Sequence, residues 1–231
     1  MKTMLKIMIV MVIAGIIMFA GCGKKEEKRE MTVEDPEKII EVKKAPDETE
    51  VKLKPIVDEN YGITISCLKK FNGMCETFKK NDYDWNGKKD YPTSIAILYY
   101  GVNSVGEKIM LIEEAEAHAD YLTKGKISIK YKDSWDNNKE KTIEVTWNQE
   151  PRSNYWFAVI PKMADGTPFA DKTETNYGIC AFPAEYDKEK GVKTFIISEE
   201  GTVYEKDLGS GKPVEQWPAE DPSTKGWKIS D

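Results

Sequence analysis

The sequence predicts an α+β fold, in which helices come first and an antiparallel sheet follows. Between residues 62 and 122, apolar residues recur every three or four positions, a spacing typical of helices with one buried face. After Gly125 the pattern changes to alternation of apolar and polar residues over short segments, which is typical of half-buried strands. Helices followed by antiparallel strands indicate an α+β domain.

The amino terminus is typical of a bacterial export signal. Two lysines precede an uncharged apolar segment at residues 7–19, which is shorter than a membrane-spanning helix needs to be. Ala20 and Gly21 then precede Cys22, and this run resembles the lipobox of bacterial lipoproteins, with Phe19 in place of the usual Leu, Val or Ile. The resemblance implies cleavage before Cys22 and attachment of a diacylglyceryl group to its thiol. The alternative is an uncleaved membrane anchor, and either way the rest of the chain leaves the cytoplasm.

Charged residues and three prolines dominate the segment that follows the signal. It has too few apolar side chains to offset the entropy lost on ordering. The sequence therefore predicts a signal peptide at residues 1–21, a lipidated disordered tether at 22–59 and one globular domain at 60–231.

Three helices are predicted at the start of the globular domain. In the first, at residues 62–80, a 3-4-3 spacing forms one apolar stripe from Leu68, Phe71, Cys75 and Phe78. A short second helix is expected at residues 94–100. The third, at residues 107–122, would turn carboxylates to solvent around the only histidine, His118, and would bury Ile109, Ile112, Ala115, Ala119 and Leu122.

Six strands are predicted after the helices, at residues 126–131, 142–147, 154–160, 178–182, 193–197 and 203–206. The third of these is apolar on both faces, which is typical of a central strand. The connection at residues 198–202 is expected to be a hairpin, with Gly201 suited to a positive φ. The prolines after Gly209 indicate an irregular tail.

Three stretches, at residues 68–99, 109–120 and 177–209, together with Trp217 and Trp227, resemble pilin-like exported domains of unknown function found in planctomycetes and related bacteria. The resemblance implies a helix that leads into an acidic loop and a final hairpin built from the third stretch. It supplies no enzymatic role. Here a lipobox and a charged tether replace the prepilin leader helix of many relatives.

A short acidic loop carries most of the spacing of a calcium-binding loop. Calcium prefers several oxygen ligands from a tightly wound segment, and Gly87 at position six permits the sharp turn. Thr93 replaces the bidentate Glu at position twelve, which implies a weak site. The alternative is a turn without an ion, since Asp, Asn and Gly favour turns by themselves. The candidate ligands are the side chains at positions one, three, five and nine and the backbone carbonyl at seven, which belong to Asp82, Asp84, Asn86, Asp90 and Lys88.

Three cysteines remain beside the lipidated Cys22. In an oxidising compartment one disulfide is expected. Cys67 and Cys75 are eight residues apart on one predicted helix, so they would lie about 12 Å apart, too far for a disulfide. The candidate pair is Cys180 with Cys67 or Cys75, and the alternative is three buried free thiols.

Charge and motifs narrow the function classes. Without Lys2 and Lys6 the chain has 32 basic residues against 40 acidic ones, a net charge of −8, which excludes the electrostatic footprint of a nucleic-acid-binding protein. A single histidine and the lack of a G-x-S-x-G elbow or a P-loop argue against an enzyme. We therefore expect no catalytic activity.

The expected function is an exported, lipid-anchored envelope module with a structural or binding role, stabilised by calcium if the acidic loop binds it. In a bacterium with two membranes, Gly23 after Cys22 resembles sorting to the outer membrane. Trp85 and Trp135 lie in polar loops and are candidates for contact with a protein or glycan partner, and Trp156 is a third exposed candidate. The alternatives are a carbohydrate- or peptide-binding lipoprotein, a pilus- or secretion-associated subunit, and a hydrolase.

Overall fold

The computed structural model describes residues 48–84, 87–103, 105–133, 135–136 and 139–230. The predicted signal, Cys22 and most of the predicted tether lie outside the described residues, as do Trp85 and Asn86. Helices and antiparallel sheets make up the described part, so the predicted α+β class is confirmed.

The helices are α1 (Glu48–Asn81), α2 (Ile97–Tyr100) and α3 (Glu114–His118), with two 3-10 helices, η1 (Phe169–Lys172) and η2 (Pro222–Lys225). The strands are β1 (Lys126–Asp133), β2 (Lys139–Thr146), β3 (Tyr155–Val159), β4 (Gly178–Pro183), β5 (Lys193–Ser198), β6 (Tyr204–Asp207) and β7 (Lys228–Ile229). All six predicted strands are present, and β7 is an addition.

Two antiparallel sheets are formed. β1 and β2 make a two-stranded ribbon, and the five-stranded sheet has the order β3-β4-β5-β6-β7. Strands adjacent in sequence are therefore adjacent in the sheet. In the hairpin between β5 and β6, Gly201 has a φ of 79°, as the sequence predicts for this turn.

The prediction that the strand at 154–160 is central is wrong, because β3 is the first strand in the sheet order. Its outer edge is covered by the segment after α3. Phe157 N donates to Ala119 O at 2.9 Å, and Tyr121 N donates to Phe157 O at 2.8 Å. This cover buries an edge strand as a neighbouring strand would, which explains why its sequence is apolar on both faces.

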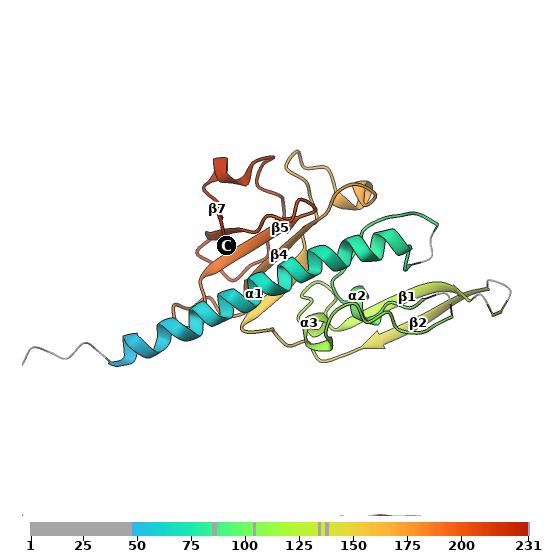
Figure 1. Cartoon of the computed structure of the whole chain (residues 1–231), viewed down its shortest axis with the longest axis horizontal. Coiled ribbons are helices and arrows are strands. Elements are labelled where there is room, and N and C mark those ends of the chain that lie inside the picture. Colours follow the sequence, from blue (N-terminus) through green and yellow to red (C-terminus); the bar gives the residue numbers. More distant parts are fainter. Residues whose placement is uncertain (1–47, 85–86, 104, 134, 137–138, 231) are drawn as a thin grey trace, which may run out of the picture. The chain divides into compact units, whose positions relative to one another are not determined.

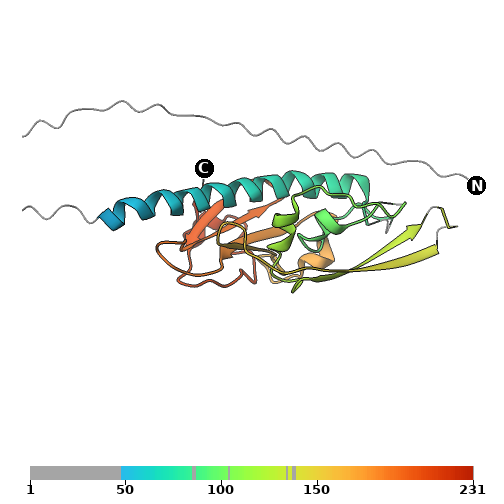
Figure 2. The ribbon, with the colours of Figure 1, turned by 90° about the horizontal axis from the view of Figure 1, so that it is seen from below.

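Helix α1 lies along one face of the five-stranded sheet, against β4 and β5 (Figures 1 and 2). It begins at Glu48, so residues 48–59, which were assigned to the disordered tether, are helical instead. The predicted stripe is confirmed, since its four residues are buried against the sheet: Leu68, Phe71, Cys75 and Phe78. Tertiary packing of this stripe, rather than helix propensity, stabilises most of such a helix.

The third predicted helix, at residues 107–122, is wrong over most of its length, because only Glu114–His118 is helical. Met110 has a φ of 43°, which is left-handed and ends any helix. Leu111 N then donates to Leu98 O at 2.8 Å. The chain before α3 therefore runs beside α2 in an extended form.

The buried face of this region also differs from the prediction. Ala115 is exposed and Leu122 is 48% exposed, although Ile112 and Ala119 are buried as expected. Glu116, expected on the solvated face, is only 3% exposed. Apolar spacing identified the segment as partly buried but not the side chains that α3 turns inward.

Two hydrophobic clusters lie on opposite faces of the five-stranded sheet. The helix-side core lies between α1 and the sheet and includes Phe71, Phe157, Ile179 and Phe195. Alternate residues of β4 and β5 face the other way. With η1 and the C-terminal tail they form the tail-side core: Ala158, Ile160, Phe169, Cys180, Phe182, Ile196, Trp217 and Trp227.

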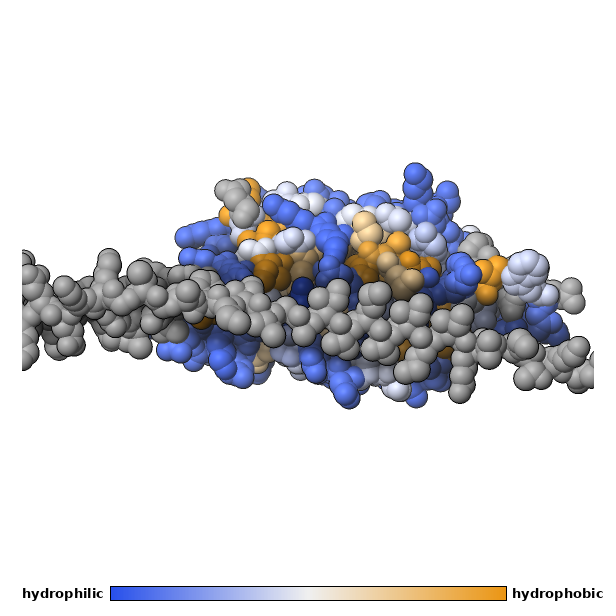
Figure 3. Space-filling model, turned by 60° about the horizontal axis from the view of Figure 1, so that its bottom comes forward, coloured by the Kyte–Doolittle hydropathy of each residue, from blue (hydrophilic) through white to orange (hydrophobic). Residues whose placement is uncertain are grey.

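Hydrophilic residues cover most of the visible part of the face in Figure 3, and apolar residues form separate patches among them. Within the described ranges, no helix combines the length and the apolar character needed to cross a membrane.

Candidate functional site

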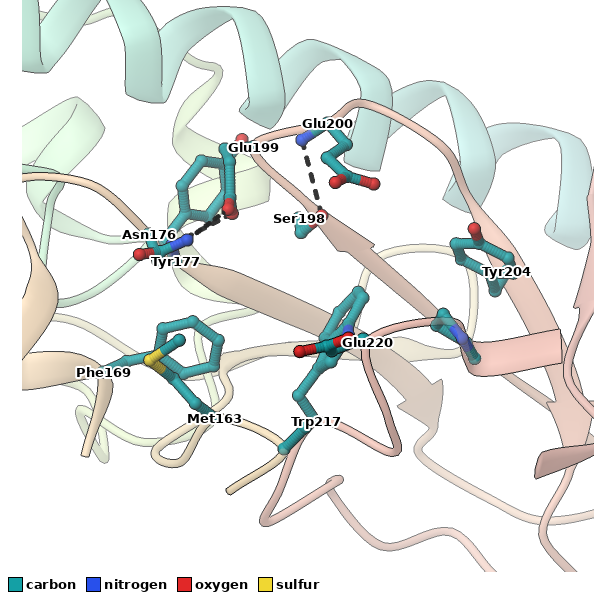
Figure 4. A pocket seen from close by; sticks show the side chains of 12 residues that line it. Met163, Phe169, Asn176, Tyr177, Ser198, Glu199, Glu200, Tyr204, Trp217 and Glu220 are labelled. Atoms are coloured by element: carbon teal, nitrogen blue, oxygen red, sulfur yellow. Dashed lines mark hydrogen bonds between the residues drawn. The ribbon is translucent and has the colours of Figure 1, made fainter. Parts of the chain in front are cut away.

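A cavity of about 360 Å³ opens on the tail side of the sheet (Figure 4). Segments far apart in the sequence line it: η1, the residues before β4, the β5–β6 hairpin and the tail before η2. Cavities of this size are typical of small-molecule sites. None of the segments carries a local motif for a site, which is why the sequence did not reveal the cavity.

Three aromatic rings form much of the cavity wall, and they are Phe169, Tyr204 and Trp217, whereas the ring of Tyr177 packs in the helix-side core. Backbone contacts fix two of them, because Phe169 N donates to Pro161 O at 3.0 Å and Trp217 N donates to Lys162 O at 2.8 Å. A Cβ at Gly178 would lie 3.2 Å from the Phe169 ring and 3.3 Å from the Trp217 ring. The absence of a side chain at this position lets both rings pack closely over the start of β4.

Three carboxylates line the same cavity: Glu199, Glu200 and Glu220. Glu199 accepts hydrogen bonds from Asn176 Nδ2 at 2.6 Å and from Tyr177 N at 3.3 Å, which hold its carboxylate in place (Figure 4). Glu200 and Glu220 are exposed. The cavity thus joins an aromatic wall to an anionic rim.

Negative charge around the cavity also affects Tyr204, one of the residues that line it. Burial raises the pKa of Tyr204, and the negative charges of Asp221 and Glu200 raise it further. No lysine or arginine belongs to the described lining of the cavity. The electrostatic potential there favours a cation.

The predicted calcium loop is described only in part. Asp82 has a φ of 50°, and its Oδ2 accepts a hydrogen bond from Gly87 N at 3.2 Å. Its Oδ1 is buried and has no hydrogen-bond partner among the described residues. Asp84 and Asp90 are half-buried and Lys88 is exposed.

Within the described ranges, no three His, Cys, Asp or Glu side chains gather as a group that could hold a metal ion. The carboxylates of the acidic loop therefore do not form a complete site by themselves. The loop does show the turn chemistry that the Asp-Asn-Gly composition favours.

Cys67, Cys75 and Cys180 are free and buried thiols, as in the second of the two alternatives for the cysteines. Cys67 and Cys75 belong to the helix-side core, whereas Cys180 belongs to the tail-side core. The sheet separates Cys180 from α1, so the pairs of Cys180 with Cys67 or Cys75 are not formed. Burial raises the pKa of Cys180 to about 12, which makes it a poor nucleophile at neutral pH.

Buried polar contacts near α3 were not predicted. The Glu116 carboxylate accepts from Lys70 Nζ at 3.0 Å and from Glu113 N at 2.7 Å, so it ties α3 to α1. Asp120 Oδ2 accepts from Ala96 N at 2.9 Å. Burial raises the pKa of Asp120. Both carboxylates satisfy backbone or ammonium donors, which indicates a structural role.

His118 lies beside aromatic rings rather than in a cluster of titratable groups. Its Nε2 is 2.8 Å from Tyr100 Oη, and its ring lies parallel to that of Trp147 with the centroids 6.3 Å apart. Glu114 approaches Nε2 only to 3.8 Å. These ring contacts hold His118 between α3 and the end of β2.

Trp135 and Trp156, two of the tryptophans expected to contact a partner, do not line the cavity. Trp135 is 83% exposed and Trp156 is half-buried between the two cores. Trp147, the residue after β2, is half-buried against the helix-side core. Trp217 was noted only within the family resemblance, and its place in a Pro-rich tail gave no sign of a pocket wall.

Residues 138–228 match the model of a family described as a protein of unknown function (DUF2950). No curated protein and no solved structure matches the chain. The matched stretch includes the five-stranded sheet up to the first residue of β7 and every segment that lines the cavity. The part of the chain that resembles a known family is thus the part that builds the pocket.

Proposed function

We propose that this chain is an exported bacterial lipoprotein, anchored through Cys22, whose globular domain binds a ligand at the cell envelope without catalysing a reaction. The observation that carries the binding role is the cavity on the tail side, where three aromatic rings stand next to three carboxylates. Concave sites with an apolar wall and a few polar groups are the usual form of ligand sites. The signal segment at residues 7–19 and the lipobox at Cys22 support export and anchoring.

The residues that line the cavity fit a binding role better than a catalytic role. A carboxylic acid that donates a proton in a reaction needs burial to raise its pKa, whereas Glu200 and Glu220 are exposed. Glu199 already accepts two hydrogen bonds. The described lining contains no histidine, cysteine or lysine that could serve as a base or nucleophile.

A pilin-like architecture belongs to the same proposal. The long helix α1 packs along an antiparallel sheet whose strands follow one another in sequence order. This arrangement supports the resemblance to pilin-like exported domains. The lipobox provides an anchor in place of a leader helix that continues into the domain.

The test of the binding role uses the full chain, purified in detergent and screened against glycans and short peptides. The variant Tyr204→Ala removes a half-buried ring of the wall, and Tyr186→Ala removes an exposed ring elsewhere. Binding that weakens only in Tyr204→Ala supports the proposal. Binding that is equal in both variants, or the lack of any ligand, contradicts it.

The anchor has its own test. Cells that express the full chain are fed a labelled fatty acid, and the wild type is compared with Cys22→Ala. We expect label and membrane association in the wild type and neither in the variant. A labelled variant, or an unlabelled wild type, would contradict attachment at Cys22.

We further propose that calcium stabilises the loop at residues 82–90. The buried Oδ1 of Asp82, which has no hydrogen-bond partner among the described residues, supports this because a buried carboxylate oxygen without a partner is costly unless a cation compensates it. Melting of the full chain in chelator and in millimolar calcium tests it. A rise in Tm with calcium that Asp82→Asn abolishes and Glu189→Gln retains supports the site, whereas equal melting in both solutions contradicts it.

A further inference from the structure

The charge of the tail-side cavity is unbalanced. Among the described residues, no ion pair includes Glu199, Glu200 or Glu220, although lysines elsewhere pair with carboxylates at 2.7–3.8 Å. Together the three carboxylates bring negative charge to a concave surface next to apolar walls, where the field of a charge is focused. A positively charged group would relieve this imbalance, and an anionic one would be repelled.

The rings of the wall also favour a cation. The faces of Trp and Tyr rings attract ammonium and guanidinium groups, and the attraction grows when the cation is partly desolvated. Trp217 and Tyr204 both line the cavity that the glutamates border, and Figure 4 draws them with Glu220 around the same pocket. Carboxylates and aromatic rings that line one cavity therefore offer two kinds of contact to a positive group.

A second cavity, of about 190 Å³, shares Phe169, Asn176 and Tyr177 with the first. The residues that complete it are mostly apolar and include Leu122, which is 48% exposed, and Val159. A ligand that crosses the Phe169 ring can thus place a cation in the first cavity and an apolar group in the second. A single small cation would leave the second cavity unused.

We propose that the two cavities bind a peptide segment in which a lysine or arginine lies next to an apolar residue, with the cation between the glutamates and the rings and the apolar side chain beyond Phe169. The proposal names the ligand of the pocket and rests on the binding role proposed above. A neutral glycan would use the rings for stacking but would not need three carboxylates without a counter-charge.

The test compares two acetylated and amidated tripeptides, Leu-Lys-Leu and Leu-norleucine-Leu, by calorimetric titration of the full chain in detergent. The two peptides have side chains of similar length and differ in the positive charge. We expect the lysine peptide to bind about tenfold more tightly, and the advantage to shrink as salt is raised because exposed charges are screened.

The double variant Glu200→Gln/Glu220→Gln removes two exposed charges of the rim, so it is expected to fold, and its melting checks this. Glu150→Gln/Glu189→Gln is the matched control, because both residues are exposed and neither lines a cavity. The lysine advantage should disappear in the rim variant and persist in the control.

The outcomes separate the ligand from the binding role. Equal binding of both peptides, with loss in Tyr204→Ala, overturns the need for a cation but keeps a binding pocket. Binding of a neutral glycan and of neither peptide overturns the peptide proposal while the binding role stands. If no peptide or glycan shows binding that Tyr204→Ala weakens, both the peptide proposal and the binding role are overturned.

Discussion

The two faces of the five-stranded sheet are covered in different ways. On one face a single long helix, α1, places a regular stripe of buried side chains over β4 and β5. On the other face η1, the C-terminal tail and η2 cover the tail-side core with irregular chain, and the cavity of about 360 Å³ lies there. Regular cover serves stability, and irregular cover leaves room for a ligand.

The largest difference in stability is expected when one phenylalanine on each face of the sheet is replaced by alanine. Phe71 is fully buried and meets Phe157 edge-on, with the ring centroids 5.0 Å apart. Phe71→Ala should lower the free energy of unfolding by about 3–5 kcal/mol, the usual cost of emptying a packed core site. Urea denaturation measures it. Phe169→Ala should cost about half as much, because the Phe169 ring borders two cavities. Equal losses at the two sites would contradict the difference between the faces.

A smaller effect should follow from the buried charge that ties α3 to α1. Glu116→Gln keeps the shape of the side chain but weakens its bonds to Lys70 Nζ and Glu113 N, and should cost about 1–3 kcal/mol in urea denaturation. Glu113→Gln is the control, since that exposed carboxylate also reaches Lys70, at 3.2 Å, and should cost less than about 1 kcal/mol. A larger loss of unfolding free energy for Glu113→Gln than for Glu116→Gln would show that burial does not determine the strength of the ion pair with Lys70.

Thiol labelling compares the opening of the two faces. Burial raises the pKa of Cys75 above its ordinary value, and burial raises that of Cys180 to about 12. At pH 8, well below both pKa values, thiolate is scarce and both side chains are at most 1% exposed, so iodoacetamide should react only when a face opens. Cys180 should react about tenfold faster than Cys75, because irregular cover opens more easily than a packed helix.

Mass spectrometry of digested protein gives the two rates. Labelling in urea adds a check on the proposed anchor, because lipidation of Cys22 would leave three reactive thiols, Cys67, Cys75 and Cys180, and a fourth would mean that Cys22 is free. Faster labelling of Cys75 than of Cys180 would reverse the assignment of the stable face.

The smallest expected effect concerns the β5–β6 hairpin, which meets α1. Gly201 has a φ of 79°, and a Cβ there would lie 3.5 Å from Asn72 Oδ1. Gly201→Ala should cost about 1 kcal/mol in thermal melting, because an alanine is strained in the left-handed region. Gly166→Ala, with a φ of 85° and open space around it, isolates the backbone cost. A much larger loss at Gly166 would mean that the tail-side loop is the stiffer one.

The regular parts of the fold were readable from the sequence. The spacing of Leu68, Phe71, Cys75 and Phe78 gave the buried face of α1, and alternation or short apolar runs gave the six predicted strands. Periodicity failed where another contact decided the backbone. Ile109 and Ile112 follow a helical spacing, yet Ile109 N donates to Gly101 O at 2.9 Å in an extended segment.

The candidate site could not be predicted from the sequence either, because tertiary contacts determine it. Its three rings, Phe169, Tyr204 and Trp217, come from η1, from β6 and from the tail. Only the tertiary structure brings them together. Trp217 stands in a Pro-rich stretch that sequence patterns mark as irregular. The acidic loop and Cys22 could be singled out because their signals are local, a spacing and a short motif.

The covered outer edge of β3 has a consequence for crowding. Proteins held by lipid on one membrane surface meet each other at high local concentration, and exposed sheet edges then invite intermolecular strand pairing. Here the backbone contact of Phe157 with the segment at Ala119–Tyr121 occupies one edge, and β7 at the other end is two residues long and carries Lys228. A neighbouring molecule therefore finds little ladder to extend at either edge of the five-stranded sheet, and the longer open edges belong to the β1–β2 ribbon.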